Sequence, residues 1–220
     1  MPQKHLSKKE LKEDPFFEEV SHLIGFYQKY RKQIMILGVI IIMLLIAFFA
    51  AKSISEKNNT LAAGYFGIGL DYYMKNMLPA AEDQFLIVAS EYKETSWGKR
   101  SNYYLGMIAR GMGESDDMIL SYLDTFVGSN LKDDALKASA YQLIAAIYYR
   151  NEDFTTAGEN YHLAAKHALN KKDKVDYGVR AGEAFLEAGQ LEKRDELIAY
   201  LRTLDVDEAQ KARIDLISSK

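Results

Sequence analysis

An uncharged apolar run from Ile34 to Ala51 constrains this chain more than any other feature. It reads IMILGVIIIMLLIAFFAA, 18 residues without a charged or strongly polar side chain. As an α-helix it would span about 27 Å, close to the roughly 30 Å hydrocarbon core of a bilayer. Basic residues flank it at Arg31, Lys32 and Lys52. Because a buried core helix rarely stays apolar on every face, the run predicts one transmembrane helix in the lipid bilayer.

A cleavable signal peptide is the alternative interpretation of this run. A signal peptide has a short basic leader and a shorter apolar region, whereas 33 residues precede Ile34 here. The sequence Ala51-Lys52-Ser53 is also a poor cleavage site. We therefore expect the run to stay in the protein as an anchor.

The run also divides the charge of the chain. Residues 1–33 carry seven Lys/Arg and five Asp/Glu, whereas residues 52–220 carry 21 and 26. Short basic flanks favour the cytoplasm, so the sequence predicts a cytoplasmic N-terminus and a C-terminal domain, residues 52–220, outside it. Close to the run the difference in basic residues between the two sides is small, with Lys29, Arg31 and Lys32 before it and Lys52 and Lys57 after it. A repeat domain in the cytoplasm therefore stays open as an alternative.

The cytoplasmic segment, residues 1–33, is expected to contain an amphipathic juxtamembrane helix. Asp14 and Pro15 form a helix start, with Asp at the N-cap and Pro at the first helical position. Val20, Leu23 and Tyr27 then recur at helical spacing. Together with the basic residues that follow, this pattern is typical of a helix that lies on the inner leaflet or docks on a partner. The alternative is a helix that merely leads into the membrane span.

Composition excludes several functional classes. The chain has no cysteine, so it has no disulfide, thiolate metal site or cysteine nucleophile. A pI near 5.9 argues against nucleic-acid binding. His162 and His167 are five residues apart on an expected helix, an unsuitable spacing for shared metal ligation. We expect no catalytic, metal or cofactor site, no small-molecule substrate and no enzyme activity.

Residues 52–220 contain an internal repeat that predicts an all-α fold. Four small residues recur 37, 39 and 37 residues apart, at Gly69, Gly106, Ala145 and Gly182. A bulky residue follows each by sixteen positions, at Phe85, Tyr122, Tyr161 and Ile198. The expected helices span residues 59–75, 79–92, 96–111, 115–128, 133–150, 153–169, 173–188 and 191–204, with a polar capping helix after Asp205 ending near Ile217.

This pattern resembles the tetratricopeptide repeat, a helix–turn–helix unit of about 34 residues. The resemblance implies a right-handed α-solenoid of about four helical hairpins, in which small residues let paired helices approach closely. The second and fourth units depart from the pattern, with Met118 and Arg194 where alanine is usual.

In stacked hairpins the first helix of each unit lines an inner groove, so side chains off its packing stripe become candidate protein-binding residues. Aromatic residues, methionine and arginine are enriched at protein interfaces. The alternative is that these side chains belong to the core. The candidates are Phe66, Leu70, Tyr73, Tyr103, Met107, Arg110, Gln142, Tyr149 and Arg150.

The whole layout, a short basic segment, one span and a degenerate four-unit repeat, resembles the YfgM-like proteins of the bacterial inner membrane. This resemblance implies an ancillary subunit of the Sec translocon, with a periplasmic repeat domain that binds translocon subunits, periplasmic chaperones or unfolded clients. The alternative is a membrane-tethered repeat adaptor for another complex, such as one in envelope assembly.

Overall fold

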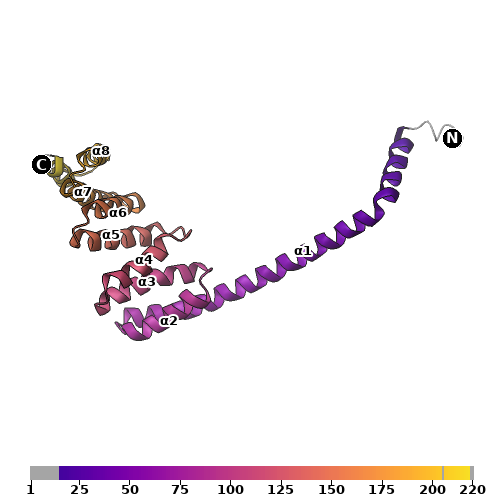
Figure 1. Cartoon of the computed structure of the whole chain (residues 1–220), viewed down its shortest axis with the longest axis horizontal. Helices are drawn as coiled ribbons and strands as arrows, with labels where there is room; N and C mark the ends of the chain where they lie inside the picture. The colour runs from indigo at the N-terminus through magenta and orange to yellow at the C-terminus, as the bar shows by residue number, and fades with distance from the viewer. Residues whose placement is uncertain (1–14, 205, 219–220) are drawn as a thin grey trace, which may run out of the picture. The chain divides into compact units, whose positions relative to one another are not determined.

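A computed structural model describes residues 15–204 and 206–218 of the chain, and this part contains α-helices and no strand. Figure 1 shows α2 to α8 following one another in sequence order. The helices are α1 Pro15–Met74, α2 Leu78–Glu91, α3 Ser96–Met112, α4 Asp116–Val127, α5 Asp134–Arg150, α6 Phe154–His167, α7 Lys171–Glu187, α8 Leu191–Arg202 and α9 Glu208–Ser218. The expected all-α class is confirmed, and the expected ends of α2 to α9 agree within a few residues.

The first helix differs from the expectation. Separate helices were expected over residues 34–51 and 59–75, whereas a helix leading from Pro15 into the span was one of the open interpretations. In the structure α1 is one continuous helix of 60 residues. The polar stretch after Ala51 contains no proline or glycine before Gly64, and Lys52 pairs with Glu56 one turn later at 3.9 Å. Polarity alone therefore does not end this helix. Asp14, the expected N-cap, lies outside the described residues.

The chain forms two compact units, Met1–Glu56 and Lys57–Lys220. In the first unit α1 is long and apolar enough to cross a membrane, and none of its most apolar window is buried in the structure. Leu44 is 65% exposed and Phe49 is 63% exposed. The side chains of this stretch pack against no other described part of the unit, as a lipid-facing helix requires.

Local capping sets the starts of the later helices. The Thr95, Asp133 and Asp153 side chains accept hydrogen bonds from the backbone N–H groups of Gly98, Leu136 and Thr156, at 3.0, 3.3 and 3.0 Å. Each bond satisfies one of the N–H groups that a helix start leaves without a partner.

The turn inside each expected hairpin contains one residue in the left-handed region. These residues are Asn76, Gly113, Glu152 and Gly189, with φ of 58°, 78°, 62° and 68°. They are 37, 39 and 37 residues apart, the same intervals as the four small residues of the repeat. These four residues fall in the gaps between the expected helices of each hairpin, at residues 76–78, 112–114, 151–152 and 189–190, where the chain was expected to turn.

In the second unit every helix from α2 to α8 packs against its successor, and α9 packs against both α7 and α8. The buried side chains fall into three clusters that follow one another along the chain. The first centres on Phe66, Phe85 and Leu105, the second on Leu123 and Phe126, and the third on Phe185, Leu201 and Ile217.

Small residues sit where helices approach one another. A Cβ added at Gly69 would lie 3.2 Å from the Phe85 ring, the pair that the repeat predicted. A Cβ at Gly106 would lie 2.7 Å from Leu123, the neighbour of the predicted Tyr122. At Gly182 the close neighbour is Ile217 of α9, not Ile198, because the last helix packs across α7.

Candidate protein-binding surface

Two of the predicted groove residues lie in the core. Phe66 is 5% exposed and contacts the rings of Phe85, Trp97 and Tyr104 at centroid distances of 5.3, 5.0 and 5.4 Å. Tyr103 is 8% exposed, and its hydroxyl hydrogen-bonds Ser139 Oγ at 2.9 Å. The expectation that these two side chains face an open groove therefore does not fit the structure.

The error has a physical cause in α1. The stretch from Asn58 to Leu70 contains no charge, so its periodicity does not tell which face meets the core. The face that packs contains Ala62, Phe66 and Gly69, whereas Ile68 is 48% exposed. The repeat pattern predicted packing by Tyr65 and Ile68, and the buried side chain is instead that of Phe66, so the buried stripe is displaced by one residue, about 100° around the helix.

The other predicted residues divide between packing and exposure. Leu70, Tyr73 and Met107 are half-buried at the edges of the first two core clusters, and Tyr73 meets Tyr104 edge-on at 5.5 Å. Tyr149 is 37% exposed and lies against Phe154 at a centroid distance of 5.1 Å.

The three polar candidates have different surroundings. Arg150 is ion-paired with Asp116, whose carboxylate also accepts a hydrogen bond from Asn151 at 3.1 Å. These bonds, Arg150 first, lower the pKa of Asp116. Arg110 is exposed and Gln142 is half-buried.

Gln142 of α5 lines a polar cleft of about 270 Å³, whose walls also include residues of α7 and α9. The other lining residues are Asp173, Asp176, Tyr177, Arg180 and Arg213, from α7 and α9. Sequence reasoning missed them. In each earlier unit the first candidate lies three residues before the small residue of the repeat, as Gln142 lies before Ala145. The same position in the last unit is Val179, which is 4% exposed. Only the contact with Gln142 reveals these residues.

Burial shifts the pKa of two tyrosines, Tyr73 of the predicted set and Tyr177 of this cleft. Burial raises the pKa of Tyr73, Tyr103 adds to the rise, and Arg110 opposes it. Burial also raises the pKa of Tyr177, where Asp173 and Asp176 add to the rise and Arg180 opposes it, with a smaller contribution from Tyr103.

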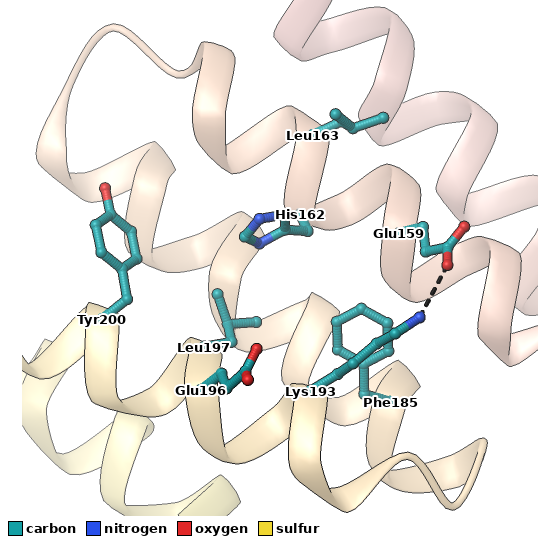
Figure 2. Close-up of a pocket in the computed structure, with 8 residues that line it drawn as sticks. All are labelled: Glu159, His162, Leu163, Phe185, Lys193, Glu196, Leu197 and Tyr200. Carbon is teal, nitrogen blue, oxygen red and sulfur yellow. Dashed lines mark hydrogen bonds and ion pairs between the residues drawn. The ribbon is translucent and has the colours of Figure 1, made fainter.

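A larger and more apolar cavity of about 530 Å³ lies between α6, α7 and α8. Figure 2 shows His162 of α6 near Leu197 and Tyr200 of α8. It also shows the hydrogen bond that Lys193 Nζ donates to Glu159 Oε1, at 2.9 Å. The Nδ1 atom of His162 is buried and has no hydrogen-bond partner among the residues that the structure describes. Burial first, and Lys166 second, lower the pKa of this imidazole. Sequence reasoning considered His162 only as a metal ligand and did not find this cavity.

Among the described residues, no three His, Asp or Glu side chains gather as they would around a metal ion. The sequence matches no known protein-family model, and no curated protein matches it either.

Proposed function

We propose that this protein is a membrane-anchored helical-repeat protein that binds other proteins and has no catalytic role. In this proposal the second unit is a tetratricopeptide-like, right-handed solenoid of four hairpins. The hairpins are the end of α1 with α2, α3 with α4, α5 with α6, and α7 with α8, followed by α9 as a cap. The observation that carries the proposal is the set of four left-handed turn residues spaced 37, 39 and 37 residues apart.

Polar contacts between successive hairpins support the same arrangement. Within the described residues, six such pairs join residues 33 to 36 positions apart, close to one repeat length, so corresponding parts of neighbouring units lie side by side. They are Arg100–Asp133, Tyr103–Ser139, Arg150–Asp116, Asn151–Asp116, Gln190–Thr155 and Lys193–Glu159. The cap α9 is joined to the last hairpin in the same way, since Arg213 pairs with Asp176, 37 positions earlier.

A binding role is supported by the exposed part of the candidate set. Stacked hairpins form an extended surface that suits a segment of another protein. Tyr149 and Arg110 are exposed, and aromatic and arginine side chains contribute much of the energy of protein interfaces.

The anchoring part of the proposal places α1 across a bacterial inner membrane as a single span. The N-terminus is then cytoplasmic and the repeat unit periplasmic, as the basic residues before Ile34 favour. The resemblance to YfgM-like proteins suggests partners at the exit of the Sec translocon and among periplasmic chaperones. An adaptor for another complex, including one with the repeat unit in the cytoplasm, is the alternative.

Two measurements on the full-length protein test this proposal. In spheroplasts, added protease should degrade the repeat unit while leaving a cytoplasmic marker intact. A protected repeat unit would overturn the periplasmic placement.

Co-purification in mild detergent, followed by mass spectrometry, should recover translocon subunits or periplasmic chaperones with the full chain. A version with the repeat unit removed should lose them and serves as the control. Recovery of a different complex would favour the adaptor alternative, and recovery of no specific partner would contradict the binding role.

A further inference from the structure

The part of α1 that belongs to the second unit carries no charge on its exposed side. Residues 58–70 contain no Asp, Glu, Lys or Arg, although these residues make up 27% of the chain. Seven of the 13 are exposed, namely Asn59, Thr60, Leu61, Gly64, Tyr65, Gly67 and Ile68. In α5 the stretch 138–149 is also uncharged, but within it Tyr149 is the only exposed residue. Because a helix face in water is normally charged or strongly polar, the exposed side of residues 58–70 has the character of a covered surface.

Three large apolar side chains gather on this side of the helix. Leu61, Tyr65 and Ile68 are exposed, and their spacing of four and three residues places them within about 60° of one another around the helix. Tyr65 forms one edge of the group, since its ring stacks against Tyr92 of α2 at 6.2 Å. We call Leu61, Tyr65 and Ile68 the apolar stripe.

Gly64 lies beside the apolar stripe, about 40° around the helix from Ile68. A Cβ added at Gly64 would meet nothing within 4 Å in the described part of the chain. At six glycines inside α3, α6 and α7 an added Cβ would lie 3.1 Å or less from a neighbour, so packing explains them; they are Gly98, Gly106, Gly111, Gly158, Gly178 and Gly182. A glycine destabilises the middle of a helix relative to alanine. A second helix crossing at Gly64 would offset this, because the missing side chain lets two backbones approach closely.

We propose that the apolar stripe and Gly64 form a contact between two copies of this chain. The inference rests on the anchoring part of the proposed function and adds a partner to it. Two copies anchored by the same run, in the same direction, carry their stripes at the same height. A two-fold axis along the membrane normal then places each stripe residue against its counterpart in the other copy. Since the stripe is uncharged, this pairing brings no like charges together.

The small size of the apolar stripe favours an occupant held in the same membrane. A stable interface between soluble proteins uses about 20–30 residues from each partner, many more than the stripe offers. Anchoring two chains in one bilayer raises their effective concentration, so a smaller contact suffices. Lipid does not suit the stripe, because Lys52, Glu56 and Lys57 separate it from the apolar run along the chain. A second copy is the membrane-held partner whose own stripe is necessarily apolar and at the matching height.

Cysteine crosslinking of the full chain in native membranes tests this inference. The chain contains no cysteine, so each variant has a single reactive thiol. Two versions with different tags are produced together, and the washed membranes are oxidised with copper phenanthroline. Leu61→Cys and Ile68→Cys should each give a disulfide-linked product that contains both tags, because a disulfide forms only between closely placed residues. Met74→Cys is the matched control, since Met74 is exposed but lies about 120° or more from the stripe, and it should stay monomeric.

A charge placed on the apolar stripe should remove the contact. In the Leu61→Cys background, Ile68→Lys brings two ammonium groups together across the two-fold axis, and the crosslinked product should be lost. Met74→Lys in the same background adds the same charge away from the stripe and should leave the product unchanged. Because both positions are exposed, neither variant should unfold the second unit, and circular dichroism checks this.

The inference is overturned if Leu61→Cys and Ile68→Cys give no more double-tagged product than Met74→Cys, or if Ile68→Lys leaves the product unchanged. A product that joins the stripe to a different protein in place of a second copy overturns it as well. Carbonate extraction of the same membranes shows separately whether the chain is anchored, and co-purification shows whether it binds other proteins. Failure of this contact is therefore distinguishable from failure of the proposed function.

Discussion

At the scale of single residues, burial decides how several side chains of this protein ionise. Burial raises the pKa of Tyr104, which stacks against Phe85 at a centroid distance of 5.0 Å, and Tyr103 and Tyr73 add to the rise. His162 is the corresponding basic group, and burial lowers its pKa. A shift of either sign makes stability depend on pH, because the folded and unfolded states then bind protons differently.

For His162 we expect stability to fall as the pH falls. Unfolded chain takes up a proton near the ordinary value of 6.5, whereas the folded imidazole stays neutral to a lower pH. Below about pH 6.5 the unfolded state is therefore favoured, with a slope under about 1.4 kcal/mol per pH unit, until the folded pKa is passed. The charged groups that face or influence this ring are Glu159, Lys166, Lys193 and Glu196.

Urea unfolding of the full chain in detergent, followed by circular dichroism between pH 7.5 and 5, measures this effect. His162→Gln should give a shallower dependence on pH than the unmodified protein. His22→Gln, at an exposed position of α1, is the control and should leave the dependence unchanged. Equal slopes for the His162 variant and the unmodified protein would refute the role of this histidine.

At the scale of helices, close approach at small residues determines which substitutions the fold tolerates. Alanine usually stabilises a helix by about 1 kcal/mol relative to glycine. At Gly106 this gain is opposed, because the new Cβ would lie 2.7 Å from Leu123, which is fully buried. At Gly67 a Cβ would meet nothing within 4 Å.

Gly106→Ala should therefore destabilise the second unit by about 1–3 kcal/mol, as overpacking does. Gly67→Ala should leave stability unchanged or raise it by up to about 1 kcal/mol. The midpoint of urea unfolding distinguishes the two variants. A Gly106→Ala variant as stable as Gly67→Ala would show that α3 and α4 are not closely packed at this point.

Helix positions were more predictable than helix faces. The turns between the helices, and the side-chain caps that begin α3 to α7, depend on residues within one turn of each other, so they can be predicted from the local sequence. In α3, by contrast, residues on more than one face are buried, including Ser101, Tyr103 and Leu105. A periodicity argument assumes one buried stripe, so it assigned Tyr103 to a groove.

At the scale of the whole molecule, the apolar run in α1 should decide whether the protein is held in a membrane. An arginine at the centre of a membrane-spanning helix costs about 2.5–3.5 kcal/mol. Replacing Leu37, Ile41 and Leu45 together by arginine should cost roughly 8–10 kcal/mol, which exceeds the gain from the remaining apolar residues.

We expect this triple variant to leave the membrane pellet on carbonate extraction, whereas the unmodified chain stays in it. Substituting the same three positions by valine keeps the run apolar and should preserve membrane retention. If the triple arginine variant remained as firmly integrated as the valine control, α1 would not be the anchor.

The sequence by itself determined the all-helical class, the apolar run and the turns of the repeat, because each depends on residues close together in the chain. Tertiary structure alone decided which face of α1 is buried and which arginines form an ion pair with an aspartate. Five do so: Arg100, Arg150, Arg194, Arg202 and Arg213. Four of those five pairs join residues at least 13 positions apart. Only folding brings such charges together, so the sequence alone does not show which arginines have a carboxylate partner. Local composition cannot contain that information, because an ion pair depends on the distance between its two charges in space.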